Sequence, residues 1–321
     1  MENNLDFKEI LEAAALRREK IASRNTAYRL VNGIADGLSG VTLDRFGTHF
    51  QLQFFGAENL RFKKVLVNAV QEFFNPEFFV IKYRLDPSGK ILENPRIEIE
   101  TGTAENSSTF VQEGPCIFQV DLLDTVNPGL FLDMRAIREE IAQRSENKSL
   151  LNLFSYTCSF AVHARVHGAE HVTNVDISAK ILEKGQGNYA LNSIEAKPGE
   201  FFRGNSEEYL RWCVKKGKRF DGIILDPPSF SRDKNKVFRV KDDLQKLVHL
   251  CGAILAPDGF LMVSSNYSGF TPETLGKTSL QSVRETHPQA KLIWCKSQGE
   301  DFPGSGNSRE SCLSAALITV S

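Results

Sequence analysis

The spacing of hydrophobic residues changes near residue 122 of this 321-residue chain. Before that point, apolar residues at helical spacing predict an amphipathic helix within residues 5–24. The run 48–54 alternates between polar and apolar residues and predicts a strand, and the Asp-x-Phe-Gly sequence before it is typical of a hairpin turn. The other elements expected here are strands at 27–31, 40–47, 79–84 and 96–100 and a helix at 63–74. They predict a small α+β domain of residues 1–122, with substrate binding as one candidate role.

After residue 122 the pattern becomes one of strands alternating with helices. We expect strands at 150–156, 171–176, 201–205, 220–226, 260–266, 292–296 and 312–320, and helices at 134–145, from 160, and at 179–192, 207–216, 242–255 and 275–285. Such alternation implies βαβ units and a mainly parallel sheet, and two successive strands at the end fit a closing antiparallel hairpin. The fold class predicted for residues 123–321 is therefore α/β, with a seven-stranded, doubly wound, Rossmann-like sheet.

Amino-acid composition and cysteine usage predict a globular, intracellular protein. The chain is 41% hydrophobic and 25% charged, and its six cysteines form no Cys-x-x-Cys pair. They are typical of reduced, mostly buried thiols, and the acidic, polar N-terminus is no signal peptide, so we expect a cytoplasmic protein. No apolar run reaches the roughly 18 residues of a membrane helix. His163 and His167 have a spacing that can hold a metal, but no acidic ligand lies between them and no metal is expected.

Charge gives only a local signal, because the net charge is −1. Positive residues gather in two clusters, Lys215, Lys216, Lys218 and Arg219, and then Arg232, Lys234, Lys236, Arg239 and Lys241. Either cluster can be a solvated surface. The second can also hold a phosphate backbone, which would place nucleic acid beside the motif that precedes it.

That motif is Asp226-Pro227-Pro228-Ser229-Phe230, which ends a buried apolar run. The two prolines stop the strand because neither has an N–H for the ladder and both fix φ. A carboxylate and a rigid turn carbonyl are thereby expected at the carboxyl end of a central strand, the edge where open α/β sheets bind ligands. The alternative is an ordinary proline-rich turn.

The turn after the first strand of this sheet, 154–160, contains no glycine. A dinucleotide loop of the Gly-x-Gly-x-x-Gly type is therefore disfavoured, because its glycines let the backbone approach a pyrophosphate. Asp176, about 20 residues later, can accept hydrogen bonds from both hydroxyls of a ribose. It can instead cap the next helix, a role that Ser178 could also fill. Asn205 can bond an adenine amino group or form a turn.

Several ordered motifs resemble class I S-adenosylmethionine (SAM)-dependent methyltransferases, and in particular bacterial 23S ribosomal RNA methyltransferases of the K/L and I types. The motifs are Gly129-Leu130-Phe131-Leu132-Asp133-Met134-Arg135, Phe154-Ser155-Tyr156-Thr157, Val175-Asp176, Asp226-Pro227-Pro228-Ser229-Phe230 and, in the N-terminal part, segments within 27–47. The resemblance runs from about residue 10 to the end. It implies SAM as the cofactor and RNA, in particular 23S ribosomal RNA, as the substrate.

By the same resemblance, one set of residues would bind the cofactor, with Asp226 facing the transferable methyl group. The set is Phe131, Asp133, Arg135, Phe154, Ser155, Tyr156, Thr157, Asp176, Ile177, Asn205 and Asp226. For Asp133 and Arg135, helix capping and a surface ion pair are the alternatives. Cys158 departs from the family, where many relatives have glycine, and we expect no counterpart here to the RNA-binding PUA module of the I type.

The acceptor atom depends on whether a thiol is present. Methylation of cytosine carbon-5 requires a Cys thiolate that adds to carbon-6, and in I-type relatives this cysteine follows the fifth strand. The corresponding segment 263–270 has no cysteine, and Cys251 and Cys295 are expected in the core. Its Ser-Asn-x-x-x-Gly-Phe pattern resembles the K-type domain, which methylates a ring nitrogen of guanine.

The resemblance therefore favours a ring-nitrogen acceptor, which needs positioning more than covalent help. Asp226, the Pro227 carbonyl, Ser229 and Asn266 would hold the base edge as the catalytic residues. Phe230 or Tyr267 would stack on the base, or else pack on the sheet, and Arg232 and Lys234 would bind the substrate backbone. Three alternatives stay open: cytosine-5 methylation, methylation of a protein or small molecule, and a non-catalytic SAM- or RNA-binding role. For the oligomeric state, a homodimer is one option.

Overall fold

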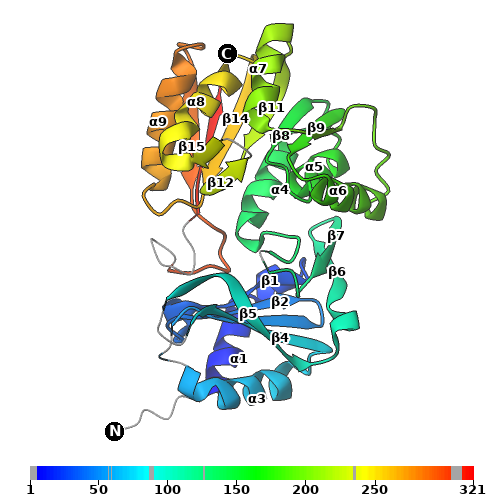
Figure 1. Ribbon diagram of the computed structural model, residues 1–321, viewed down its shortest axis with the longest axis vertical. Helices are drawn as coiled ribbons and strands as arrows, with labels where there is room; N and C mark the ends of the chain where they lie inside the picture. Colours follow the sequence, from blue (N-terminus) through cyan, green and yellow to red (C-terminus); the bar gives the residue numbers. More distant parts are fainter. Residues whose placement is uncertain are drawn as a thin grey trace. The chain divides into compact units, whose positions relative to one another are not determined.

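The computed structural model describes residues 6–56, 58, 60–86, 90–125, 127–233, 236–304 and 313–321. The chain forms two compact units (Figure 1), Met1–Arg135 with Gly299–Ser311, and Ala136–Gln298 with Cys312–Ser321. The sequence predicts the domain boundary after residue 122. The first unit instead continues to Arg135 and includes residues from the loop between the last two strands.

The first unit is built on a five-stranded sheet with the order β1-β2-β3-β4-β5. Its elements are α1 (Phe7–Arg17), α2 (Glu19–Ala22), β1 (Ala27–Asn32), η1 (Gly33–Asp36), β2 (Val41–Phe46), β3 (His49–Phe54), η2 (Leu60–Phe62), α3 (Lys63–Phe74), β4 (Phe78–Leu85), β5 (Ile91–Thr101), η3 (Ala104–Asn106), β6 (Ser108–Glu113), β7 (Cys116–Asp121) and η4 (Leu132–Met134). Neighbouring strands are antiparallel except β3 and β4. The predicted hairpin between β2 and β3 and the helix over 63–74 are present, whereas the β6–β7 hairpin had not been predicted.

Both faces of this sheet are buried at β3. Apolar side chains of α1 and α3, such as Leu11 and Val70, pack against one face. On the other, Gln51 and Gln53 are also buried, and Gln53 donates to Asp44 at 3.3 Å. The alternating sequence of β3 thus separates an apolar face from a polar face that is covered as well.

A segment from near the end of the chain completes the first unit. Asp301 is fully buried, and its carboxylate accepts hydrogen bonds from the Arg135 guanidinium and from the Arg29 backbone N–H. Its carbonyl accepts a bond from Arg18 at 3.0 Å, and Arg18 also forms two bonds to Asp36. The two buried carboxylates therefore face a cluster of arginines, which balances the cost of burying their charge.

The second unit is a seven-stranded sheet with the order β10-β9-β8-β11-β14-β16-β15. Its elements are α4 (Arg135–Gln143), β8 (Ser149–Leu153), α5 (Ser159–Val166), β9 (His171–Asp176), α6 (Ala179–Leu191), β10 (Phe201–Arg203), α7 (Ser206–Lys216), β11 (Phe220–Leu225), β12 (Phe230–Asp233), β13 (Lys236–Arg239), α8 (Val240–Gly252), β14 (Leu255–Ser265), α9 (Pro272–Arg284), β15 (Lys291–Lys296) and β16 (Ser314–Thr319). The strands from β10 to β14 in this order are parallel, and β16 is antiparallel to both neighbours. This confirms the predicted doubly wound α/β sheet.

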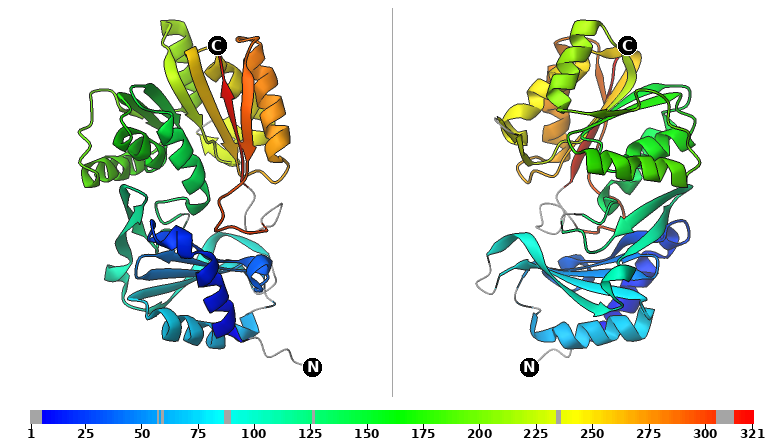
Figure 2. Two further views of the ribbon diagram at one scale, coloured as in Figure 1. Left: turned by 180° about the vertical axis from the view of Figure 1, so that it is seen from behind. Right: turned by 45° about the vertical axis from the view of Figure 1, so that its right-hand side comes forward.

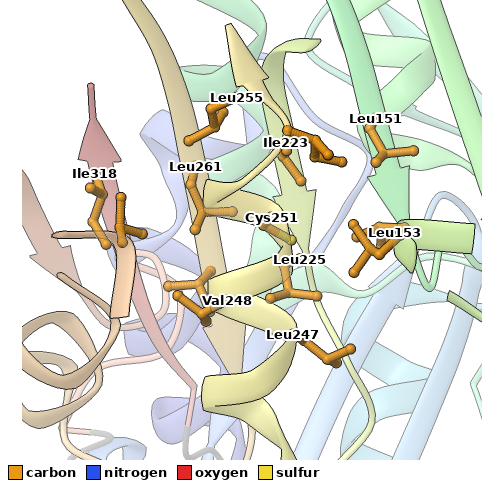
Figure 3. Close-up of a cluster of buried hydrophobic side chains, with 14 of the residues drawn as sticks. Leu151, Leu153, Ile223, Leu225, Leu247, Val248, Cys251, Leu255, Leu261 and Ile318 are labelled. Atoms are coloured by element: carbon orange, nitrogen blue, oxygen red, sulfur yellow. The ribbon is translucent and has the colours of Figure 1, made fainter. Parts of the chain in front are cut away.

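The core of the second unit lies between the sheet and the helices α7, α8 and α9. Figure 3 shows Val248 and Cys251 of α8 among Ile223, Leu225 and Leu261 of the central strands. The helices α5 and α6 lie on the other face (Figure 2). A strand covered on both sides must be apolar throughout, which is why 223–225 could be recognised as central from sequence. No helix in the described ranges is long and apolar enough to cross a membrane.

Candidate active site

The candidate site lies at the carboxyl ends of the parallel strands in the second unit. After β8 the chain adds β9 and β10 on one side, and then β11 and β14 on the other. The strand order therefore reverses between β8 and β11, and open α/β sheets bind ligands at such a switch point. The turns that follow β8, β9, β10, β11 and β14 bring the predicted site residues of this unit to one edge.

The turn after β8 is strained. Phe154, Tyr156 and Cys158 all have positive φ, at 55°, 47° and 61°. For residues with side chains this costs about 1–3 kcal/mol each and persists only where the surroundings impose it. Hydrogen bonds do so here, because the Tyr156 N–H donates to Asp176 at 3.0 Å and the Cys158 N–H to the Ser155 carbonyl at 2.8 Å. The strand expected to reach residue 156 consequently ends at Leu153.

Cys158 fits this turn because a glycine faces it. Its side chain is fully buried, and a Cβ added to Gly185 of α6 would lie 2.5 Å from its Sγ. Burial also raises the pKa of the Cys158 thiol. The departure from the family's glycine is thus accommodated by the neighbouring helix, and this thiol stays protonated and is no nucleophile.

We expect Gly185→Ala to destabilise the protein by about 1–3 kcal/mol, because the new methyl group overlaps Cys158 Sγ. Cys158→Gly should recover most of that loss in the double variant, since it removes the sulfur. The check is urea unfolding of both single variants and the double variant. Gly187→Ala is the matched control, because a Cβ at Gly187 on the same helix meets nothing within 4 Å. Equal effects at the two glycines would contradict the proposed fit.

Asp176 ends β9 and its carboxylate faces backbone amides. It accepts hydrogen bonds from the N–H groups of Tyr156 at 3.0 Å and Ser178 at 2.9 Å. Burial raises the pKa of Asp176, while these backbone hydrogen bonds oppose the shift. Ser178 caps α6 by accepting from the Ile181 N–H, so Asp176 is not needed as the cap. The ribose role stays a prediction, and Ile177, which is half-exposed, follows at the same edge.

Asn205 lies between β10 and α7 and bonds the backbone at the start of the helix. It is the N-cap of α7, and its Oδ1 accepts from the N–H groups of Glu207 at 2.9 Å and Glu208 at 3.2 Å. An adenine amino group would need the same oxygen as its acceptor. The adenine contact remains a prediction, and the helix cap is a role for Asn205 that the sequence did not predict.

Asp226 is held by a residue that the sequence reading missed. Ser264 on β14 is fully buried, and its hydroxyl donates to Asp226 Oδ1 at 2.7 Å. Because Leu225 pairs with Val263, the next residues of the two strands come side by side. The sequence signal that could have identified Ser264 is its place as the first polar residue after the buried apolar run of β14. Pro227 is buried, whereas Ser229 is exposed.

The segment after β14 supplies an exposed amide and a packed aromatic ring. Asn266 is exposed, and the Tyr267 ring packs edge-on against Phe270, with 5.3 Å between ring centroids. A Cβ at Gly269 would lie 2.3 Å from the Tyr267 ring, so the glycine makes room for it. The packing alternative for Tyr267 is therefore present, and its stacking on a base stays a prediction.

The remaining predicted residues fall elsewhere. The backbone of Phe230 and Arg232 forms β12, but their side chains and all of Lys234 lie outside the described residues. Phe131, Asp133 and Arg135 belong to the first unit. There Arg135 is 8% exposed, so its ion pair with Asp301 is buried rather than at the surface as the alternative had it. The cofactor roles of these three residues stay predictions.

A protein-family model described as S-adenosylmethionine-dependent methyltransferase matches residues 80–305. The chain belongs to this methyltransferase family. The methyltransferase is 30% identical over 301 residues to ribosomal RNA large subunit methyltransferase I of Aliivibrio fischeri, which covers 92% of this chain and 76% of the relative. It is 35% identical over 207 residues to ribosomal RNA large subunit methyltransferase K/L of Pseudoalteromonas translucida, covering 64% and 28%. Among solved structures, SMU.776 complexed with SAH has a TM-score of 0.84 at 24% identity, covers 98% of this chain and 81% of its own, and supports the fold.

The described residues of the methyltransferase fit SAM, which supplies a methyl group on a sulfonium. SAM carries no phosphate, in agreement with a first turn that lacks the glycines of a pyrophosphate loop. Its ribose needs a hydrogen-bond acceptor, and Asp176 is a carboxylate at the expected strand end. No group of three His, Cys, Asp or Glu side chains in the described part of the methyltransferase could hold a metal ion.

Proposed function

We propose that this methyltransferase transfers the methyl group of SAM to a ring nitrogen of a nucleotide base in large-subunit ribosomal RNA. The observation that carries the choice of atom is the Asp226–Ser264 pair at the cofactor edge, without a reactive thiol beside it among the described residues. The two relatives named for large-subunit RNA support the substrate class. Both relatives are bacterial, and bacterial ribosomal RNA is made and modified in the cytoplasm, so the proposal places the protein there.

The chemistry asks mainly for positioning. A ring nitrogen has a lone pair that attacks the methyl carbon directly, so the protein has to hold the base in line and keep water away. The Ser264 hydroxyl fixes the Asp226 carboxylate, which can accept hydrogen bonds from N–H groups on the base edge. The Pro227 carbonyl, Ser229 and Asn266 are the other candidates for this edge. A base extruded from a helix would suit such a site.

The competing reaction, cytosine-5 methylation, needs a thiolate. Cys158 and Cys251 are fully buried, and burial raises the pKa of both thiols. Burial raises the pKa of Cys213 and Cys295 as well, and Cys116 is buried in the first unit. None of these five is poised to form the covalent adduct. Cys312 lies outside the described residues, and its substitution tests whether it takes part.

We expect Cys251→Ser and Cys312→Ser to transfer methyl groups to ribosomal RNA at rates within about twofold of the wild type, since nitrogen methylation forms no thiol adduct. The measurement is incorporation of labelled methyl from SAM, with RNA containing 5-fluorocytidine as a trap for adducts. A trapped protein–RNA adduct that Cys312→Ser abolishes, together with lost activity, would establish cytosine-5 chemistry in place of the proposal.

The substrate class is tested by mass mapping of ribosomal RNA from cells with and without the gene. The expected result is the loss of one ring-nitrogen methylation in the large-subunit RNA, restored by the purified protein and SAM. An unchanged set of modifications would remove the RNA proposal and leave a protein or small molecule as the acceptor.

A further inference from the structure

The outer part of helix α7 carries exposed aromatic rings next to positive charges. Strand β10 is an edge of the seven-stranded sheet, and α7, which Figure 1 labels, follows it in sequence. Phe202 of β10 is 43% exposed and Trp212 of α7 is 41% exposed, high fractions for side chains of this size. The exposed cations beside them are Lys215, Lys216, Lys218 and Arg219. We call these six residues the α7 surface.

The rings of this surface are held in a continuous row. The centroid of Phe202 lies 4.6 Å from that of Tyr209, which is buried, and Tyr209 lies 5.4 Å from Trp212. The Lys218 ammonium is 5.0 Å from the centre of the Trp212 ring. Gly204 lets Phe202 lie across the backbone, because a Cβ there would meet its ring at 2.5 Å. The exposed faces are therefore presented on a fixed support.

The positive charge of this surface is not cancelled by the helix's first turn. Glu207 pairs with Arg211 at 3.0 Å and with Lys246 at 2.6 Å, so its charge is already balanced. Glu208 is the remaining acid of α7, whereas the α7 surface carries four cations. In a helix, residues three and four apart are neighbours, which puts Lys215 and Lys216 beside Trp212.

Exposed flat rings flanked by cations match the chemistry of single-stranded RNA. Bases stack on aromatic faces whatever their sequence, while lysine and arginine neutralise phosphates. A solvated basic helix explains the lysines, but it gives no reason to leave Phe202 and Trp212 exposed on either side of Tyr209. Charge and ring exposure together therefore favour RNA over an acidic protein as the partner.

We propose that the α7 surface binds unpaired RNA that flanks the methylated base. The inference rests on the proposed function. Helix α7 begins at Ser206, directly after its N-cap Asn205 at the cofactor edge, and its 11 residues run away from that edge, a length of about 16 Å at about 1.5 Å per residue. RNA on this surface therefore lies outside the acceptor site and adds affinity without touching the reacting atoms.

The binding test uses fluorescence anisotropy with labelled transcripts of large-subunit ribosomal RNA. Trp212→Ala should weaken binding about tenfold, within the range of one lost stacking contact. Trp212→Phe keeps a ring and should retain most of the affinity, which separates stacking from folding. Replacing Lys215, Lys216 and Lys218 by Gln should lower the slope of log affinity against log salt by about 2, from about 0.7 per phosphate lost on single strands.

The matched control replaces three other exposed lysines, Lys20, Lys277 and Lys291, by Gln and should leave the slope unchanged. In steady-state transfer the α7 variants should raise KM for RNA with kcat and SAM affinity unchanged, since the site itself is intact. Equal RNA binding by the wild type and the α7 variants would overturn the proposal. It would be the result if the α7 surface bound an acidic protein instead of RNA. If the wild type binds RNA but methylates none, the proposed function fails while the binding test still decides the role of the α7 surface.

Discussion

Asp226→Asn is expected to lower the rate of methyl transfer by about 100- to 1000-fold, the usual effect of removing a group that holds the reacting partner. The amide oxygen of Asn can still accept the Ser264 hydroxyl, so the local fold is kept. The variant loses the second carboxylate oxygen, which would accept hydrogen bonds from N–H groups of the base, because Asn has a donor NH2 in its place. Single-turnover transfer at saturating SAM measures this step without interference from cofactor affinity.

Two further variants make the result specific. Ser264→Ala should cost about 10- to 100-fold, because it releases the carboxylate without removing it. Asp258→Asn, in an exposed stretch of β14 where φ is 58° and Asn is well tolerated, should have no effect. Wild-type single-turnover rates for Asp226→Asn would show that Asp226 does not hold the acceptor.

Asp301→Ala is expected to cost about 3–5 kcal/mol of unfolding free energy, because it leaves buried charge without a partner. The Arg135 guanidinium would lose both of its bonds to this carboxylate, and the Arg29 backbone N–H would lose its acceptor. A domain is commonly stable by only about 5–15 kcal/mol, so the loss is large. Urea unfolding of the full chain is the measurement.

The matched control is an exposed ion pair of the same unit. Lys8 and Glu72 lie 2.7 Å apart with exposed fractions of 58% and 61% for their side chains. Glu72→Ala should therefore cost less than about 1 kcal/mol. If Asp301→Ala costs no more than Glu72→Ala, the buried cluster contributes little to stability.

The overall fold could be predicted because local periodicity reports it. The apolar run 220–225 and the segment 171–176 became β11 and β9, and their spacing with helices implied the parallel sheet. Such apolar runs are visible in sequence because they involve only residues that are close together in the chain. The β6–β7 hairpin escaped because the apolar residues Phe110 and Ile117 occupy exposed positions, which obscures the polar–apolar alternation in its sequence.

The site could be predicted only in part. Asp176 and Asp226 were found because they end buried strands, a local signal. The positive φ of Phe154, Tyr156 and Cys158 gave no such signal, because these residues have no preference for that conformation. One of the hydrogen bonds that hold it joins Tyr156 to Asp176, 20 positions away in sequence. Asp301 was missed for the same reason, since its partner Arg135 is 166 positions away in sequence.

The ion pair between Arg135 and Asp301 also determines when the first unit can finish folding during synthesis. Ribosomes add about 5–20 residues per second, so the 166 positions that separate the pair take about 8 to 33 s to make. During that interval the first unit has emerged without the segment that neutralises its arginines. A nascent chain therefore holds this unit incomplete until the second sheet has almost been made, and a fragment that stops after residue 135 would never close it.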